Sequence, residues 1–314
     1  MLKSVLRYAE YAAFRLVAAL VRALPLDAAS DIMGFLWRTI APHTSRQKRA
    51  LDHIGAAFPH MGLAERRNLS LRMWDNLGRT AAESLCLDRI IADPARLDNQ
   101  AQQTVERMRD DGKGGILVSL HMGNWEITIL PTLLAGMPIM SAYQRIKNPL
   151  VDAYVRRNRS RLYPAGLHAK GARTGRLLYD FVAKGGHVGL LVDHRDVRGV
   201  PIRFFGRDAM TSLFPAALAL RLGVPLAVGR TVRTKGARFR IEAEVVDFQP
   251  SGDDENDAIE LTQAYYSIFE TWIRERPEQW MWIHERWRTR QPADSTDRTQ
   301  AEPLERAARS GRSL

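Results

Sequence analysis

The stretch Gly115-Ile-Leu-Val-Ser-Leu120 runs directly into His121-Met-Gly-Asn-Trp-Glu126. The apolar run is typical of a buried β-strand, and the Gly-Asn pair after it predicts a turn. A histidine therefore stands where the strand ends, and a carboxylate follows five positions later. Histidine is the side chain best suited to accept a proton near neutral pH, and a neighbouring carboxylate can fix its tautomer. The stretch predicts a strand that presents a general base, His121, with Glu126 as its orienting carboxylate.

The same pair has a structural alternative. His121 can cap the helix that follows, and Glu126 can be a solvated residue in its first turn, where negative charge is favourable. No serine or cysteine stands at a nucleophile elbow nearby. On the catalytic interpretation the activated hydroxyl therefore belongs to the substrate, which indicates a group-transfer site and not a hydrolase triad.

The stretch lies in a region where strand-like and helical patterns alternate. Apolar runs bounded by glycine or proline, and one alternating segment, predict strands at 114–120, 137–143, 187–193, 224–231 and 238–246. Helical periodicity is found at 124–134, 149–162, 173–184, 209–222 and about 255–276. This alternation predicts an α/β fold with a largely parallel sheet that is covered by helices on both faces.

Asp193 is a second polar residue expected at the ligand-binding edge of this sheet. Like His121, it directly follows a strand-like run, and ligands in such sheets bind at the carboxyl ends of strands. The Asp193-His194 pair is either an active-site group or a structural ion partner. A metal site that combines this pair with His121 and Glu126 is conceivable. The sequence holds no paired ligand spacing such as His-Glu-x-x-His, so we expect no metal.

Residues 1–93 have helical patterns throughout, and residues 1–26 have a character of their own. In a helix the charged residues of this segment fall within one arc, and these are Lys3, Arg7, Glu10, Arg15 and Arg22. They interrupt the apolar run well short of the ~20 residues that a membrane span needs. We expect an amphipathic helix that lies in a membrane interface. The alternative is a helix packed on the protein's own core.

The rest of the chain is expected to form one domain and a tail. The domain extends over 27–291, with a helical part at 27–93 and an α/β part at 114–291. After Gln291 the sequence is rich in small and charged residues and has almost no large apolar ones. Such a composition cannot bury enough apolar surface to order the chain, so 292–314 is expected to be a disordered tail.

Composition limits the class of partner. The 314 residues carry a formal net charge of +11, and 45% of them are apolar. The positive charge favours an anionic partner such as phospholipid, a phosphorylated ligand or an acidic protein. The sequence has no zinc-finger spacing and no RNP-type aromatic motif, so we expect no nucleic acid. A single cysteine, Cys86, cannot form an internal disulfide, which favours a reducing compartment.

Several other segments are candidates for ligand contact. Arginines follow Asn148-Pro149 at positions 156, 157, 159 and 161, where they can bind phosphate or carboxylate or can form a solvated basic face. Phe204-Phe-Gly206 looks like a loop that leads into the helix at 209–222, whose amino terminus can bind an anion or be merely capped. The tryptophans near the end of the domain, Trp280, Trp282 and Trp287, are interpreted as packing residues.

Taken together, these segments resemble the late acyltransferases of lipid A biosynthesis, the lauroyl/myristoyl transferase family. The matches follow the family's order: HMGNWE at 121–126, YQRIKNPLVD at 143–152, Arg-x-Arg at 159–161, VDH at 192–194, PIRFFGRDAMTS at 201–212 and RPEQWMWIHERWRTR at 276–290. The resemblance covers residues 30–290, and Pro-Glu-Gln-Trp-Met-Trp-Ile-His is its most specific block.

The resemblance implies a glycerol-phosphate-acyltransferase-like α/β fold and an O-acyltransferase. Such an enzyme moves a fatty acyl chain from acyl carrier protein, as a co-substrate, to a hydroxyl of an anionic lipid A precursor, and it needs no cofactor. It would work on the cytoplasmic face of the bacterial inner membrane as a peripheral or monotopic protein. The resemblance places the catalytic pair on His121 and Glu126. It implies substrate-binding residues at Arg159 and Asp193, and we expect Asn124 and Arg161 to join them.

The sequence departs from the family in two places. The amino-terminal helix is more charged than the usual spanning anchor, and the segment after Asp193-His194 reads Arg-Asp-Val-Arg. Two rival functions stay open. One is an acyltransferase that acts on another glycolipid or a lysophospholipid, for example a phosphoinositide mannoside. The other is a non-catalytic protein that binds a membrane surface.

Overall fold

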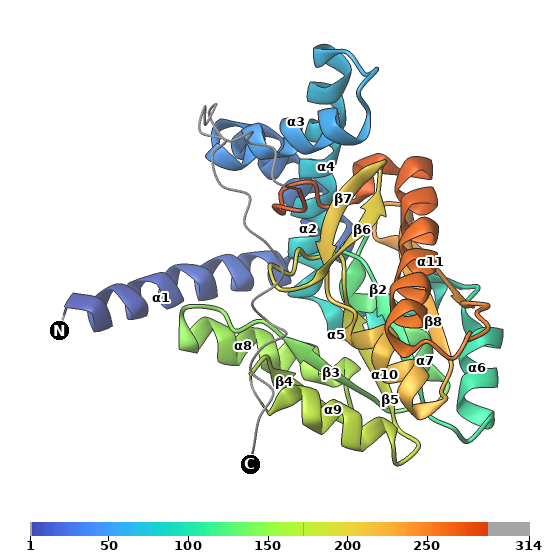
Figure 1. Ribbon diagram of the computed structural model, residues 1–314. Coiled ribbons are helices and arrows are strands. Elements are labelled where there is room, and N and C mark those ends of the chain that lie inside the picture. Colours follow the sequence, from blue (N-terminus) through green and yellow to red (C-terminus); the bar gives the residue numbers. More distant parts are fainter. Residues whose placement is uncertain (1, 172, 288–314) are drawn as a thin grey trace.

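The computed structural model describes residues 2–171 and 173–287, and the tail expected at 292–314 lies outside them. In this part of the chain, helices at the amino terminus lead into an α/β unit with a largely parallel sheet (Figure 1). The predicted fold class is therefore confirmed.

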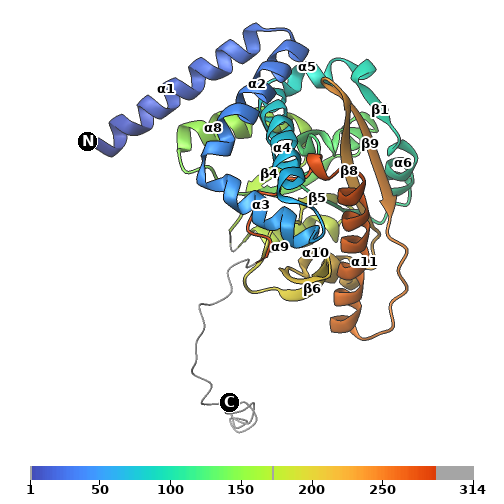
Figure 2. The same ribbon diagram turned by 90° about the horizontal axis from the view of Figure 1, so that it is seen from above.

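The amino-terminal region consists of helices, as its periodicity predicts. They are α1 (Leu2–Ala23), α2 (Leu26–Ile40), the 3-10 turn η1 (Ala41–His43), α3 (Ser45–Ala57), α4 (Leu63–Ser84) and α5 (Leu87–Ile91). Pro25 separates the first two helices, because proline cannot continue a helix from within. α2 packs along α4, whereas most of α1 projects from the body of the molecule (Figure 1, Figure 2).

α1 contacts the rest of the protein through two of its charged side chains and through buried Ala18 and Val21, while several of its large apolar side chains are exposed. Arg22 donates a hydrogen bond to Asp88 at 2.7 Å, and Asn148 donates one to Glu10 at 2.9 Å. The large side chains exposed on this helix include Val5, Leu6, Leu16, Val17 and Leu20. Among the described residues, no helix combines the length and the apolar character that crossing a membrane requires.

The sheet of the α/β unit has the strand order β1-β9-β8-β2-β5-β3-β4 within the described residues. Its strands are β1 (Leu97–Asn99), β2 (Gly115–Ser119), β3 (Ile139–Tyr143), β4 (Gly166–Ala169), β5 (His187–Leu191), β8 (Leu226–Lys235) and β9 (Arg238–Val245). β8 and β9 pair antiparallel, and the other pairs are parallel. The strand that carries the opening stretch, β2, lies in the middle between β5 and β8.

Helices cover both faces of this sheet. They are α6 (Gln102–Asp110), α7 (Leu130–Leu134), α8 (Pro149–Arg159), α9 (Thr174–Val182), α10 (Phe214–Leu222) and α11 (Asp254–Glu275). The shorter 3-10 turns are η2 (Pro94–Arg96), η3 (Trp125–Ile127), η4 (Ser160–Leu162) and η5 (Pro277–Gln279). Successive β2 residues point to opposite faces: Val118 packs in one core with α4, α10 and α11, and Leu117 packs in a second with α5, α6 and α7.

The Phe-Phe-Gly segment is not the helix-leading loop that the sequence suggests. Residues 209–211 belong to strand β7 (Arg207–Thr211), which pairs with β6 (Val200–Phe204) in an antiparallel hairpin. Phe205 and Gly206 form its turn with φ values of 54° and 68°. Positive φ at both central positions matches the twist of paired strands, which explains the hairpin. The predicted helix at 209–222 therefore begins only at Phe214.

The predicted helix at 124–134 is also shorter than expected. It is divided into η3 and α7, and Pro131 stands in the first turn of α7, where proline is tolerated. The apolar run that suggested one longer helix instead contributes Ile127, Ile129 and Leu130 to the core beneath the sheet.

A buried ion pair joins the helical region to the sheet. Glu83 of α4 is fully buried and pairs with Arg233 of β8, whose Nη2 donates to Oε2 at 2.9 Å. Ser30 of α2 donates to Oε1 of the same carboxylate at 2.7 Å, and Asn124 donates to Oε2 at 2.9 Å. Because these donors come from separate elements, Glu83 connects α2, α4, β8 and the segment after β2.

Removing the Glu83 carboxylate should leave the Arg233 charge buried without its partner. We expect Glu83→Ala to lower the free energy of unfolding by about 3–5 kcal/mol, measured by urea denaturation. The matched control is Asp180→Ala, which breaks the exposed pair between Arg176 and Asp180 and should cost at most about 1 kcal/mol. Equal small losses in the two variants would contradict the structural role of Glu83.

Candidate active site

The parallel pairing of β2 and β5 brings the two residues predicted at the sheet edge together. Ser119 of β2 pairs with Leu191 of β5. His121 and Asp193 each follow two residues later, so they leave the sheet side by side. The backbone N–H of His121 donates to Oδ2 of Asp193 at 2.9 Å, and Nδ1 of His121 lies 2.6 Å from Oδ1. The prediction that both residues share the carboxyl edge of the sheet is confirmed.

Asp193 is a buried carboxylate with donors on both oxygens. Its third contact is Trp280, whose indole N–H donates to Oδ2 at 2.8 Å. Burial alone would raise the pKa of Asp193, but the charge and hydrogen bond of His121 outweigh it and hold this pKa far below its ordinary value. With Asp193 ionised, Nδ1 of His121 carries the proton and Nε2 is left as the proton-accepting nitrogen.

The backbone after β2 is held tightly, which fixes the position of His121. Gly123 has a φ of 56°, and a Cβ there would lie 2.0 Å from the carbonyl oxygen of Thr231. Its N–H donates to the carbonyl of Gln279 at 2.9 Å, and its carbonyl accepts from Thr80 at 2.9 Å. The N–H of Met281 donates to the carbonyl of His121 at 3.0 Å. The glycine of the motif is therefore required by close backbone approach.

Glu126 makes no hydrogen bond with His121 in the described chain, so the contact expected from the sequence is not found. The carboxylate is buried and forms an ion pair with Arg159 of α8, and it also accepts from the indole N–H of Trp125 at 3.2 Å. The charge of Glu126 raises the pKa of Arg159. Glu126 is bonded to Arg159, and the carboxylate that contacts the imidazole of His121 is Asp193.

Two of the residues expected to bind substrate have other surroundings. Asn124 is fully buried, donates to Glu83 and accepts from the N–H of Glu126 at 3.3 Å, so its amide is used within the protein. Its assignment to substrate binding stays a prediction. Arg161 is exposed on η4 and, within the described chain, is not among the residues that line the cavity beside His121.

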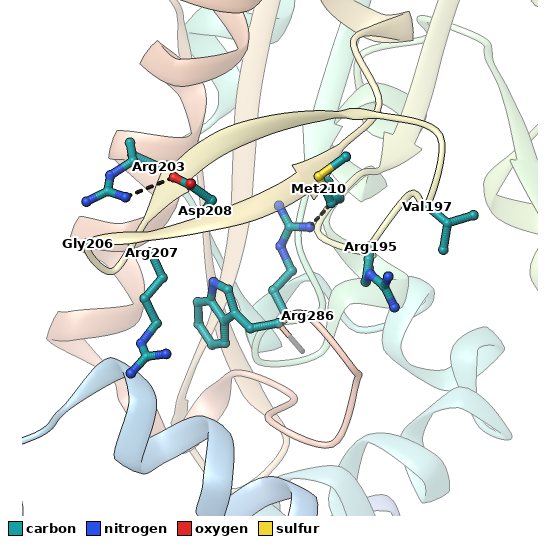
Figure 3. Close-up of a pocket in the computed structure, with 9 residues that line it drawn as sticks. Arg195, Val197, Arg203, Gly206, Arg207, Asp208, Met210 and Arg286 are labelled. Carbon is teal, nitrogen blue, oxygen red and sulfur yellow. Dashed lines mark hydrogen bonds and ion pairs between the residues drawn. The ribbon is translucent and has the colours of Figure 1, made fainter. Parts of the chain in front are cut away.

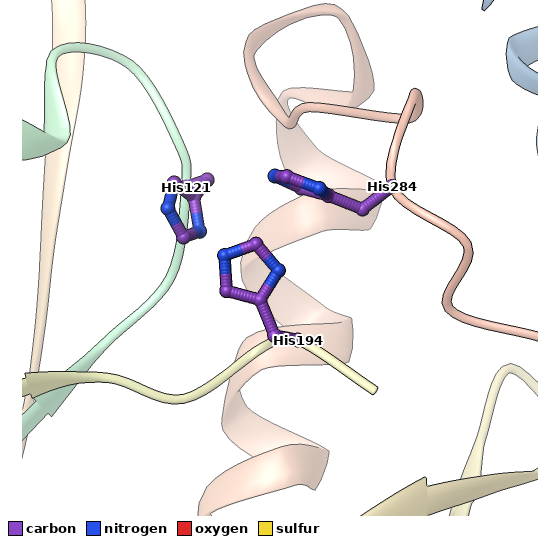
Figure 4. A group of neighbouring side chains, drawn as sticks. All are labelled: His121, His194 and His284. Carbon is purple, nitrogen blue, oxygen red and sulfur yellow. The ribbon is translucent and has the colours of Figure 1, made fainter. Parts of the chain in front are cut away.

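Two further histidines face the candidate base. The ring centroids of His194 and His284 lie 4.5 Å and 5.1 Å from that of His121, and 4.0 Å from each other (Figure 4). Burial lowers the pKa of His194 to about 4 and that of His284 to about 3, and the neighbouring His121 lowers both further. These two rings are therefore neutral near pH 7.

A cavity of about 450 Å³ opens beside His121. It runs across the sheet face that carries Leu117, between the strands and the segment from Trp125 to Ile129. Its polar lining includes His121, Glu126, Arg159, Tyr163 and His194, and its apolar lining includes Ala101, Val105, Leu117, Ile129 and Ala243. The cavity thus joins the candidate base to a space that suits an apolar chain.

A second cavity, of about 630 Å³, lies by the β6–β7 hairpin (Figure 3). Its lining is rich in arginine and comprises Arg195, Val197, Arg203, Gly206, Arg207, Asp208, Met210, Arg286 and Trp287. Arg203 is paired with Asp208 at 2.9 Å, and Arg286 donates to the carbonyl of Met210 at 2.8 Å. Arg195 lines both this cavity and the one beside His121, so it stands between them.

Sequence reasoning missed the part that residues 279–284 play in the site. Trp280 packs in the core as predicted, but its indole N–H also binds Asp193. The backbone of this segment pairs with the motif through the bridge between Met122 and Trp280. The only sequence signal for this role was that the block at 276–290 is the most specific part of the family resemblance. Its spacing from the motif does not show that the chain comes back to the end of β2.

The fold and this geometry define a site that can take a proton from a substrate hydroxyl beside an apolar cavity. A family model described as bacterial lipid A biosynthesis acyltransferase matches residues 2–289, and the chain belongs to that family. It is therefore an acyltransferase of lipid A biosynthesis, and its acceptor is a lipid A-type glycolipid. A search of the curated proteins gave no match to the chain.

Proposed function

We propose that the protein transfers a fatty acyl chain from acyl carrier protein to a hydroxyl of a lipid A precursor, with His121 as general base. The observation that carries the proposal is the buried contact between Asp193 and Nδ1 of His121 at the end of the cavity. This contact leaves Nε2 of His121 free to accept the hydroxyl proton. Asp193 fixes the tautomer and stabilises the imidazolium that forms.

These groups account for every proton and bond that changes during the transfer. Nε2 of His121 takes the acceptor proton while the acceptor oxygen attacks the thioester carbonyl carbon. The new C–O bond forms, and the C–S bond breaks when the tetrahedral intermediate collapses. The imidazolium then returns the proton to the departing thiolate, so His121 ends as it began. No cofactor is needed in this scheme.

The pair of Glu126 and Arg159 has a different part in the proposal. Glu126 holds the Arg159 guanidinium at the wall of the cavity, and Nε of Arg159 is buried with no hydrogen-bond partner in the described chain. A fixed cation with an unused donor suits the negative charge that develops on the thioester oxygen. Glu126 is thus a positioning residue for Arg159.

Loss of the base should abolish most of the activity without unfolding the protein. We expect His121→Ala and Asp193→Asn each to lower kcat by about 10²–10⁴-fold, because proton removal and its electrostatic support are lost. The assay is transfer from acyl carrier protein thioesters to a purified lipid A precursor, with circular dichroism as a test of folding. His60 is exposed, and His60→Ala should keep wild-type activity. Retention of most transfer by folded His121→Ala would contradict the proposal.

The acyl chain is assigned to the apolar end of the cavity. Ala243 of β9 and Gly229 of β8 lie side by side in the sheet, and both line that end with Val105 of α6. Small residues there leave room for a chain, and the carbonyl carbon then lies toward His121 and Arg159. The depth of this space would set the preferred acyl length.

A larger side chain in the cavity should shorten the preferred donor. We expect Ala243→Leu to lower the rate with the longest accepted acyl chain about tenfold or more, with less effect on shorter chains. The reason is that one methylene more or less in an apolar pocket changes the rate by about tenfold or more. A panel of acyl carrier protein thioesters measures the preference. Ala183→Leu, at an exposed position, is the matched control. An unchanged length preference in Ala243→Leu would place the chain elsewhere.

The acceptor head group is assigned to the arginine-rich side of the site. Arg195 lies between the two cavities, and arginine binds phosphate well because its guanidinium offers paired donors. A phosphorylated glycolipid can therefore present its hydroxyl to His121 while its phosphate contacts Arg195. The net charge of +11 also suits an acidic acyl carrier protein.

The exposed apolar side of α1 supports attachment to a membrane surface. The exposed apolar side chains of the helix are Val5, Leu6, Leu16, Val17 and Leu20, while Arg22 and Glu10 are hydrogen-bonded to the rest of the protein. A helix of this kind buries its apolar side in the acyl boundary of a bilayer. We place the protein on the cytoplasmic face of the inner membrane, where acyl carrier protein supplies the donor.

Charges on the apolar side of α1 should release the protein from lipid. We expect Leu16→Asp with Leu20→Asp to weaken binding to anionic phospholipid vesicles at least about tenfold, because each leucine loses its favourable burial. The control is Leu63→Asp with Leu134→Asp, which adds the same charge at exposed leucines outside α1. Vesicle co-sedimentation measures both variants. Equal binding by the two would contradict the assignment of α1 to the membrane.

A further inference from the structure

Three histidines from distant parts of the chain converge in the site, which no local sequence pattern indicates. His121 follows β2, His194 follows β5, and His284 follows η5. One ring nitrogen of each can be chosen so that all three lie within 4.8 Å of one another (Figure 4). A zinc ion bound at about 2.0–2.1 Å holds its nitrogen ligands about 3.3 Å apart, so small ring rotations would close the present spacing.

A ring nitrogen of His121 and one of His284 have no hydrogen bond in the described chain. His121 engages Asp193 through Nδ1, which leaves Nε2, and a carboxylate behind a histidine is a common support for a metal ligand. Nε2 of His284 is buried and has no hydrogen-bond partner in the described chain. A buried polar atom without a partner is unusual, because it loses its contact with water and gains nothing in return. A metal ion would satisfy it.

The donor set indicates the class of metal. Three imidazoles without a carboxylate ligand suit zinc and similar transition-metal ions, whereas magnesium and calcium prefer oxygen. The nearby cations Lys170 and Arg286 act on His194 and oppose a dication, and the charge of Asp193 offsets part of this repulsion. His121 and His194 also line the cavity, so a fourth position would face substrate or water.

We propose that His121, His194 and His284 form a binding site for a divalent transition metal of the zinc class, and that metal bound there inhibits acyl transfer. The inhibition rests on the proposed function, because Nε2 of His121 cannot hold a metal and accept a proton together. The binding itself does not depend on that function.

Metal binding can be measured directly on the full-length chain without a histidine tag. After treatment with a chelator, the protein is titrated with Co²⁺, whose visible spectrum reports tetrahedral nitrogen ligands, and then with Zn²⁺ as competitor. We expect one metal per chain and at least tenfold weaker binding by His284→Gln. His60→Gln is the matched control and should bind as the wild type does. No stoichiometric binding by the wild type, or equal affinity in all three proteins, would overturn the site.

Two further measurements separate the parts of the proposal. His194→Gln gives a second test of the ligand set if His284→Gln does not fold, as judged by circular dichroism, and it should bind at least tenfold more weakly. Zn²⁺ should inhibit wild-type transfer at the concentration that fills the site, and a chelator should restore it. Binding without inhibition would overturn the inhibitory role. An active His121→Ala variant would overturn the general-base proposal and leave the Co²⁺ result unaffected.

Discussion

The site depends on one buried carboxylate. Asp193 accepts from the backbone and ring of His121 and from the indole of Trp280. Its position is 1% exposed, and an unpaired charge there would cost several kcal/mol, so these donors are a condition for the fold as well as for the chemistry. The donors belong to His121, just after β2, and to Trp280, just after η5, so the Asp193 carboxylate also holds these two segments together.

The surroundings of the site repeat this pattern of buried charge with several donors. Glu83 connects α4 to β8 and holds Asn124, and Asn124 in turn accepts from the N–H of Glu126. A chain of polar contacts therefore runs from the helical region to the wall of the cavity. Hydrogen bonds of this kind restrict the side chains that make them, so they limit the positions open to Glu126 and to the Arg159 that it binds.

Much of the fold was predictable from local patterns. The strands near 114–120, 137–143, 187–193, 224–231 and 238–246 all exist, because buried strands carry recognisable apolar runs. The β6–β7 hairpin was not predicted, since Phe205 is an uncommon residue at a position with positive φ. In the site, the sequence located His121 and Asp193 at one sheet edge, and Arg159 lines the same cavity as His121. The contact expected between His121 and Glu126 was not found, because sequence proximity across a turn does not fix side-chain direction.

The sequence by itself determined the element types, the carboxyl-edge placement of His121 and Asp193, and the family, because these follow from local periodicity and from ordered motifs. The tertiary structure decided the partners. Asp193 meets His121 across 72 residues only because β5 lies beside β2 in the sheet order. His284 and Trp280 join them because the chain returns after α11 to pair with Met122. Strand order and chain return are global packing outcomes, so no local pattern in the sequence could reveal these contacts.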